Sequence, residues 1–465
     1  MNYRAVVART WLFAVTLSLG ALASRAQDET QPMPSAPPKP AGYSFPGIEP
    51  GQQEGELQPD VSPLTGIQNP TLGSPEIRHS YWVPGFQFSS NEYSHSQSGG
   101  SGWTSDNYFI GNLSLLQAWS RATLAVNYSG GGFVSTDSQQ GSGVYQQLAL
   151  AQSFHPGRWL IQLFDQFSYI PQSGFGYGGG TNLGIPGVGG PLGTPIPGLG
   201  GNYTPNQTIY GVGAFYSNTF ALQGTYALSR RGSITMAGSY GMLRFIESGS
   251  YDSNTTVASI GYNYELSRND TVGLAYRFSA YRYPANPQAY NDNVISVAYG
   301  RKVTGRVALR LFIGPEFTTF RIPVGTSSQT TGVSAAASLT YAFDKGSFSL
   351  GYIHGLSAGS GVLIGSNLDQ VTATVSRNLT RVWTGSLNFG YAHNSPVGGT
   401  KTSGYPAFND WYAGASVGRP IGRDFSFSGA YTANVGNYLG SGNTSNNYST
   451  ITLNFQWHPR PFVLR

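Results

Sequence analysis

The sequence predicts an all-β protein: a transmembrane antiparallel up-and-down β-barrel of about 18 strands, preceded by an export signal and a proline-rich segment. Three observations predict this fold: apolar and polar side chains alternate with a two-residue period, short and long connections alternate, and charged residues are few. Residues 450–457 show the period well, with Ile451, Leu453, Phe455 and Trp457 on one face and Thr450, Thr452, Asn454 and Gln456 on the other. From residue 80 onward no stretch has the apolar spacing of a helix, so the sheet must cover itself.

The composition separates this chain from soluble domains. It has 465 residues with 63 Gly, 30 Tyr and 25 Phe, and only 10% are charged, whereas soluble domains have about 25%. The mean hydropathy is −0.20, which agrees with a membrane barrel because half of each spanning strand is polar. The formal charge of +5 is modest and the basic residues are scattered among turns, so no nucleic-acid partner is expected.

Residues 1–26 have the features of a signal peptide. Arg4 and Arg9 precede an apolar run from Trp11 to Ala23, and small residues before Gln27 provide a cleavage site, with a cut after Ala23 as the alternative. The run is shorter than the roughly 20 residues that a spanning helix needs. The chain has no cysteine, which excludes disulfides and leaves no residue for a lipid anchor.

Three further regions follow. Residues 27–79, called the leader below, are rich in Pro and Gln without a period, a composition that cannot bury a core. We expect a disordered periplasmic segment, and a segment that docks on the cell wall or a partner is the alternative. Residues 80–458 form the predicted barrel, and residues 459–465 a short C-terminal tail.

Runs of alternating residues, each long enough for a tilted strand to cross a bilayer, divide the barrel region into 18 predicted strands. Their ranges are 81–92, 107–118, 122–134, 144–154, 159–171, 209–228, 232–245, 255–267, 271–283, 292–302, 305–318, 331–343, 346–356, 367–378, 381–393, 409–419, 424–436 and 447–457. A count of 16 stays open because Pro84 interrupts the first run, the sixth is too long, and Asp165 shares the apolar face of the fifth. A β-bulge in the fifth run would turn Asp165 away from lipid.

The connections indicate which end faces the periplasm. Short ones include residues 228–232, 267–270, 303–305, 344–346 and 422–424; long ones include 94–106, 172–208, 284–291, 319–330, 357–366, 394–408 and 437–446. Outer-membrane barrels have tight periplasmic turns and long outer loops. The loop at 174–206 is rich in Gly and Pro and carries no charge. It either folds inward as an uncharged constriction or forms an external cap.

The side-chain parity predicts an aqueous interior. The inward set consists mostly of Ser, Thr, Asn, Gln, Gly and Ala, which are too small to fill a cylinder of 16 to 18 strands. A smaller barrel or a sandwich with a dry core would place polar residues outside instead. Aromatic residues gather near the ends of the apolar faces, as in the interfacial girdles of membrane barrels: Tyr226, Tyr264, Tyr341, Phe343, Trp383, Trp411, Phe425 and Trp457.

Four charged residues point inward by parity and are candidates for lining a pore: Glu265, Arg277, Arg310 and Glu316. Such charges can tune ion preference, or they can pair across the wall and support the barrel. The six histidines show no metal-ligand spacing, and no nucleophile, base and orienting group can be singled out. We therefore expect no enzyme activity, no metal and no cofactor.

Two turns share an aromatic-x-Leu-Ser-Arg pattern, at residues 226–234 and 264–272, and variants occur at 341–346 and 375–381. In these turns, residues 80–458 resemble the putative β-barrel porins of bacterial outer membranes, particularly those associated with exopolysaccharide synthesis and export. The resemblance implies a passive or secretion-coupled conduit. The chain departs from many such barrels because Pro459 to Arg465 follow the last aromatic residue, Trp457.

The sequence thus predicts an outer-membrane channel for hydrophilic solutes, with saccharides and exopolysaccharide among the candidates. A surface adhesion or scaffold barrel with a closed lumen is the alternative. The expected partners are the lipid bilayer, the outer-membrane assembly machinery, which could read residues 448–457, and the transported solute. Both a monomer and a homotrimer are compatible with the sequence.

Overall fold

The structure is a computed structural model that describes residues 63–65, 80–95, 101–136, 142–170, 214–246, 250–303, 306–321, 327–358, 364–397, 407–438, 445–457, 459–460 and 462–464. The chain divides into two units, Met1–Ala41 and Gly42–Arg465, and every described residue belongs to the second. The expected signal peptide, most of the leader and the 174–206 loop lie outside these residues. Among the described residues, no helix is long and apolar enough to cross a membrane.

All 18 predicted strands are confirmed, so the alternative count of 16 is wrong. The strands are β1 (Tyr81–His95), β2 (Ser101–Ala118), β3 (Ala122–Ser135), β4 (Ser142–Phe154), β5 (Trp159–Ile170), β6 (Phe215–Ala227), β7 (Gly232–Phe245), β8 (Ser253–Glu265), β9 (Asp270–Tyr283), β10 (Asn286–Val303), β11 (Val307–Arg321), β12 (Ser327–Phe343), β13 (Gly346–Ser357), β14 (Ser366–Asn378), β15 (Thr384–Pro396), β16 (Phe408–Ile421), β17 (Phe425–Tyr438) and β18 (Ser445–Trp457). Each pairs antiparallel with the next along the chain.

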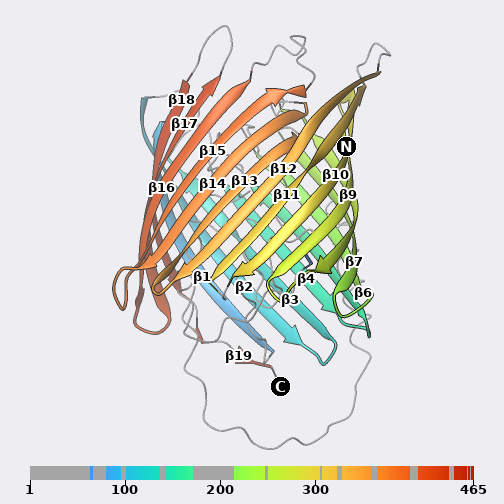
Figure 1. Cartoon of the computed structure of the whole chain (residues 1–465). Coiled ribbons are helices and arrows are strands. Elements are labelled where there is room, and N and C mark those ends of the chain that lie inside the picture. The colour runs from blue at the N-terminus through green and yellow to red at the C-terminus, as the bar shows by residue number, and fades with distance from the viewer. Residues whose placement is uncertain are drawn as a thin grey trace, which may run out of the picture. The chain divides into compact units, whose positions relative to one another are not determined.

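The sheet closes on itself through β1 and β18, which lie side by side in Figure 1. Their register runs from Phe86 opposite Trp457 to Tyr93 opposite Thr450. The C-terminal tail adds a two-residue strand, β19 (Phe462–Val463), that pairs with the start of β1. There the ring of Phe462 stacks on that of Trp82 at 4.8 Å between centroids. Closure removes the free strand edges, which is what a sheet in hydrocarbon requires.

The two faces of the barrel divide as the alternation predicts. In β18, Ile451, Leu453, Phe455 and Trp457 are exposed and Thr450, Thr452 and Asn454 are buried. We call the exposed apolar side the outer face and the opposite side the inner face. Small polar side chains join neighbouring strands on the inner face, as Ser386 and Ser416 do at 2.7 Å between their hydroxyl oxygens. The outer face suits lipid, and such cross-strand pairs stabilise the wall from within.

Two apparent irregularities in the sequence fit the regular barrel. Pro84 lies between the β1 residues that pair with β19 and those that pair with β18, so its missing N–H breaks no bond on that side. The expected bulge in β5 is wrong, because the pairing with β4 and β6 continues without a shift. Asp165 instead stays on the outer face, where Asn218 Nδ2 donates to its Oδ1 at 2.8 Å. This hydrogen bond offsets part of the cost of a carboxylate on that face.

The short connections 228–232, 267–270, 344–346 and 422–424 are confirmed as tight turns, while residues 304 and 305 of the connection 303–305 lie outside the described residues. The predicted long loop 284–291 is wrong. Residues 284–291 are not a loop, since β9 continues to Tyr283 and β10 begins at Asn286. The register between the two strands shifts between Asn286 and Ala289, next to the turn, and is regular from Ala289 onward.

A hydroxyl group organises the recurring turn motif. In the turn from β8 to β9, Ser267 Oγ accepts hydrogen bonds from the backbone N–H groups of Asn269 at 3.1 Å and Asp270 at 3.0 Å. Ser229 and Thr380 make the same contacts in two other turns, with Gly232 N at 2.9 Å and Trp383 N at 3.1 Å. This is a turn stabilised by Ser or Thr side chains, which explains why the hydroxyl recurs at this position.

Replacing Ser267 with alanine is expected to lower the free energy of unfolding by about 0.5–1.5 kcal/mol, the net worth of an ordinary hydrogen bond. The measurement is the urea midpoint of the folded band on a gel run without boiling. Ser267→Thr retains the hydroxyl and is the control, for which no change is expected. Equal midpoints for the alanine variant and the native chain would show that the hydroxyl does not stabilise the turn.

The inner face is less uniformly small and polar than the sequence predicts. A buried cluster on this face combines side chains of β2 to β7: Tyr108, Ile110, Phe133, Tyr145, Ile170, Phe215 and Leu243. The parity is clear in β2, where Phe109 is exposed between buried Tyr108 and Ile110. The inward set was predicted to be mostly small and polar, and this cluster is an exception in which large side chains pack against one another across strands.

Candidate functional site

Charged residues on the inner face of β9, β10 and β11 form the candidate site. In the register of the sheet, Val294 of β10 lies opposite both Arg277 of β9 and Glu316 of β11. The next inward residue of β10, Asp292, lies opposite Ser279 and Thr318. Inward positions recur every second residue, so the ladder places Arg277, Asp292 and Glu316 on one patch of wall. We call these three residues the charged patch.

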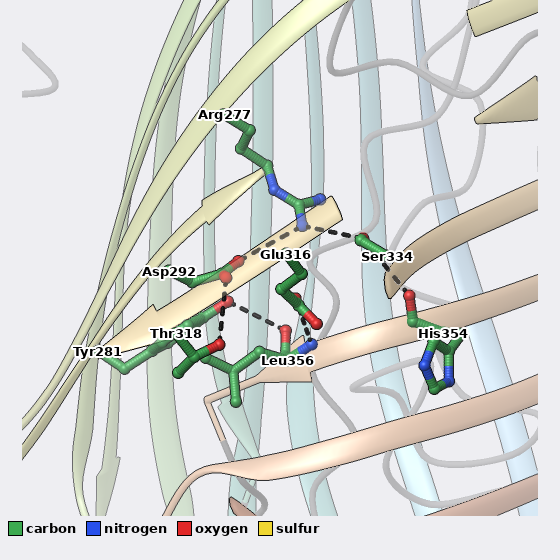
Figure 2. A network of polar contacts seen from close by, with 8 residues as sticks. All are labelled: Arg277, Tyr281, Asp292, Glu316, Thr318, Ser334, His354 and Leu356. Carbon is green, nitrogen blue, oxygen red and sulfur yellow. Dashed lines mark hydrogen bonds and ion pairs between the residues drawn. The ribbon is translucent and has the colours of Figure 1, made fainter. Parts of the chain in front are cut away.

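Figure 2 shows how the charged patch is connected. Arg277 Nη2 lies 3.7 Å from Asp292 Oδ2, and the Asp292 side chain is 0% exposed while that of Arg277 is 35% exposed. Arg277 Nη2 also donates to Ser334 Oγ of β12 at 3.4 Å, and Thr318 Oγ1 donates to Asp292 Oδ1 at 3.4 Å. The guanidinium is thus the partly exposed member and the Asp292 carboxylate the buried one.

The ladder beside Glu316 is interrupted for a local reason. No pairs join Ile295 and Ser296 of β10 to Pro315 and Gly314 of β11, although the register is the same on both sides of the gap. Proline has no N–H to donate. A Cβ at Gly314 would lie 2.7 Å from Ser296 Cα, so only glycine permits the two strands to approach this closely.

The end of β13 leaves the wall next to the charged patch. Its pairing with β12 stops at His354, whereas its pairing with β14 continues to Ser357. Leu356 is then bound by inner-face side chains of distant strands: its N–H donates to Glu316 Oε1 at 3.1 Å, and its carbonyl accepts from Tyr281 Oη at 3.2 Å. The backbone of this segment therefore lies inside the ring of strands (Figure 2).

Further contacts hold the segment Leu356–Ala358 in place. Tyr283 Oη donates to the carbonyl of Ala358, and the segment is buried in an apolar cluster of Tyr281, Tyr283, Tyr290, Phe320, Leu356, Ala358 and Val397. Gly365, at the start of the return to β14, has a φ of +68° and lies against the Tyr290 ring, where a Cβ would be 2.9 Å from Cε2. The segment narrows the interior beside the charged patch.

This inward segment was not predicted. Residues 357–366 were expected to be one of the external loops, because their length matched the others. One signal could have identified it: Leu356, Val362, Leu363 and Ile364 make the stretch apolar, unlike a loop that meets water. The loop that was expected to enter the lumen, 174–206, lies outside the described residues.

The four predicted pore-lining residues occupy different places. Arg277 and Glu316 belong to the charged patch, while Asp292, the buried member, was missed. Arg310 lies nearer the short turns, where its guanidinium stacks over the Phe312 ring at 4.6 Å and donates to the carbonyl of Leu64 in the leader. Glu265 is exposed at the end of β8, beside a short turn. The structure therefore brings two of the four together.

The arrangement is suited to contact with a passing polar solute. Arg277 offers a partly exposed cation, whereas Glu316 is only 6% exposed and is held by the Leu356 backbone. Within the described ranges, no group of three or more His, Asp or Glu side chains is placed to hold a metal ion. Within the same ranges, one histidine ring contacts an aspartate: His354 Nδ1 lies 2.6 Å from Asp369 Oδ1. This pair is on the outer face, next to Tyr352.

A closed antiparallel ring with an even number of strands, an apolar outer face and a mainly polar inner face is the arrangement of outer-membrane β-barrels. The chain is a transmembrane β-barrel of the bacterial outer membrane, with the architecture of a porin. Its outer face contacts the lipid bilayer.

Comparisons with known proteins add little to this conclusion. No family model matches the chain, and no curated protein matches its sequence. Among solved structures, Pseudomonas aeruginosa OccK2 (OpdF) in complex with glucuronate is similar over 83% of this chain and 98% of its own, at 8% identity and a TM-score of 0.44. Pseudomonas aeruginosa OpdQ is similar over 83% of this chain and 100% of its own, at 9% identity and a TM-score of 0.42. Acinetobacter baumannii OccAB3 is similar over 82% of this chain and 99% of its own, at 7% identity and a TM-score of 0.42. At these identities and TM-scores the similarity carries no function across to this chain.

Proposed function

We propose that the barrel is a passive channel for small hydrophilic solutes and that solutes pass the charged patch where Leu356–Ala358 narrows the interior. The observation that carries this proposal is that narrowing and charge coincide: Glu316, one of the charged residues, binds the Leu356 backbone directly. A charged group at a narrow point is where a channel discriminates among solutes. Polar inner side chains and an even, closed ring of 18 strands also fit a water-filled passage.

The test is conductance of the purified, folded protein in planar bilayers, combined with swelling of liposomes in sugars and carboxylates of increasing size. Stable ohmic steps and a swelling rate that falls steeply with solute size are the expected results. Swelling with saccharides but not with carboxylates of equal size would support the saccharide passage that the sequence predicts. The link to exopolysaccharide export stays a prediction and requires a polysaccharide as the solute.

A scaffold barrel with a closed lumen is the second candidate. It is favoured by inner-face side chains that have almost no exposed surface, such as Ser89 and Asn91 at 0%. Folded protein that inserts into bilayers and remains silent, without swelling in the smallest solute, would support the scaffold and contradict the channel. Assembly as a homotrimer and recognition by the assembly machinery are not needed for either candidate.

A further inference from the structure

Three residues of the leader lie inside the barrel. Thr65 is 7% exposed, and its N–H donates to Asn263 Oδ1 of β8 at 2.9 Å. The Asn263 side chain is 4% exposed and points its own amide at Thr235 Oγ1, 3.1 Å away. The neighbouring Leu64 carbonyl accepts from the Arg310 guanidinium of β11. The expectation that the whole leader lacks fixed structure does not hold at these residues.

The wall beneath Leu64 and Thr65 is built from residues without side chains. One inner-face residue in each of β8, β9 and β10 is a glycine that lies under the leader, and a Cβ at any of the three would collide with a leader side chain. It would lie 2.5 Å from Thr65 Cβ at Gly261, 2.9 Å from Thr65 Cγ2 at Gly273, and 2.8 Å from Leu64 Cδ1 at Gly300. Three glycines at one place on adjacent strands form a recess that accommodates the side chains of Leu64 and Thr65. We call Gly261, Gly273, Gly300, Asn263 and Arg310 the leader site.

The leader site lies near one end of the barrel. It lies at the end of the short turns, since Gly273 follows the start of β9 at Asp270 by three residues and Gly300 precedes the end of β10 at Val303 by three. The barrel itself begins with β1, which is nine strands from β10 in either direction around the ring. Thr65 and Ser80 are therefore held on opposite sides of the barrel, fifteen positions apart in the chain.

We propose that Leu64–Thr65 is an internal ligand of this channel: this dipeptide binds the leader site on the inner wall at the end of the short turns and lowers conductance while it is bound. The inference rests on the proposed channel function. It assigns a role to Arg310 and to the three glycines that the charged patch does not use. A peptide bound by two backbone hydrogen bonds and a small apolar contact is held weakly enough to be displaced.

The first test changes the leader and leaves the wall intact. Thr65→Pro removes the N–H that donates to Asn263, and no barrel residue is altered. The expected result is an increase in single-channel conductance of about twofold, with fewer closures, because the occupant leaves the passage. Thr65→Ser, which keeps the N–H, is the matched control and should behave as the native protein.

The second test locks the leader in place. The chain has no cysteine, so the pair Thr65→Cys and Gly273→Cys introduces the only thiols. The first substitution also removes Thr65 Cγ2, the atom that a Cβ at Gly273 would meet at 2.9 Å. Oxidation should form the disulfide in the folded barrel and lower conductance, and a reductant should restore it. The pair Thr65→Cys and Ser416→Cys places the second thiol on β16, on the other side of the ring, and should not form a disulfide.

The outcomes separate this inference from the channel function. Conductance that rises in Thr65→Pro and falls on disulfide formation supports the proposal. A conducting native barrel whose current is unaffected by either change overturns it and leaves the channel function standing. Failure of the 65–273 disulfide to form also overturns it. Folded, inserted protein that is silent in every variant, Thr65→Pro included, contradicts the channel function itself.

Discussion

Removing the guanidinium of Arg277 is expected to destabilise the barrel by about 2–4 kcal/mol. Truncating one partner of a buried ion pair typically costs 3–5 kcal/mol because the other charge stays buried; the partial exposure of Arg277 and the 3.7 Å separation from Asp292 reduce this figure. The carboxylate of Asp292 would lose the nearby cation and keep the weak contact from Thr318 beside the Glu316 side chain. The measurement is the urea midpoint of Arg277→Ala against the native barrel in detergent or lipid.

The double variant Arg277→Ala with Asp292→Asn is the control for this prediction. Asparagine removes the buried charge, so the double variant should recover most of the stability that the single variant loses. The single variant also tests ion selectivity. Arg277→Ala removes a cation from the narrow region, so the reversal potential in a salt gradient should shift toward that of a cation-selective channel. A single variant as stable as the native barrel would mean that Asp292 does not depend on Arg277.

Replacing Glu316 with alanine is expected to release the inward segment Leu356–Ala358. The Leu356 N–H would lose its acceptor while buried, which costs about 1–3 kcal/mol. That cost acts against the inward position of the segment, so larger and noisier conductance steps should follow as it opens. Single-channel recording at fixed voltage measures both properties.

Glu316→Gln is the matched control, since the amide oxygen still accepts from Leu356 while the charge is gone. It should keep the native step size and shift the reversal potential toward anions, because Arg277 then dominates the passage. Alanine and glutamine variants with the same step size would contradict a restraining role for this hydrogen bond. An unchanged reversal potential in the glutamine variant would show that the Glu316 carboxylate lies outside the path of the ions.

The strands could be predicted because the two-residue alternation is imposed locally. Each strand separates hydrocarbon from the interior, so successive residues alternate between apolar side chains that face out and polar side chains that face in. Leu453 and Thr452 in β18 are an example. The tight turns could be predicted for a similar reason, since Ser267 bonds to N–H groups only two and three residues away. Inward parity likewise identified Arg277 and Glu316 as neighbours of the interior.

Side-chain parity gave a wrong prediction where a distant residue offsets the cost of a polar side chain on the apolar face. Asp165 on an apolar face led us to expect a bulge, but Asn218, 53 residues away, supplies the hydrogen bond that keeps the strand regular. Parity also treats every inward position alike. It therefore missed Asp292 and the large side chains of the cluster around Tyr108.

Local chemistry along the chain was enough to predict the barrel, its two faces and the end that carries the short turns, and it left the strand count between 18 and 16. Only the folded ring could place Leu356 against Glu316, 40 residues earlier in the chain, and Thr65 against Asn263, 198 residues later. The physical reason is that alternation records which solvent a side chain meets, whereas occupancy of the interior depends on which segments closure of the ring brings within hydrogen-bond distance.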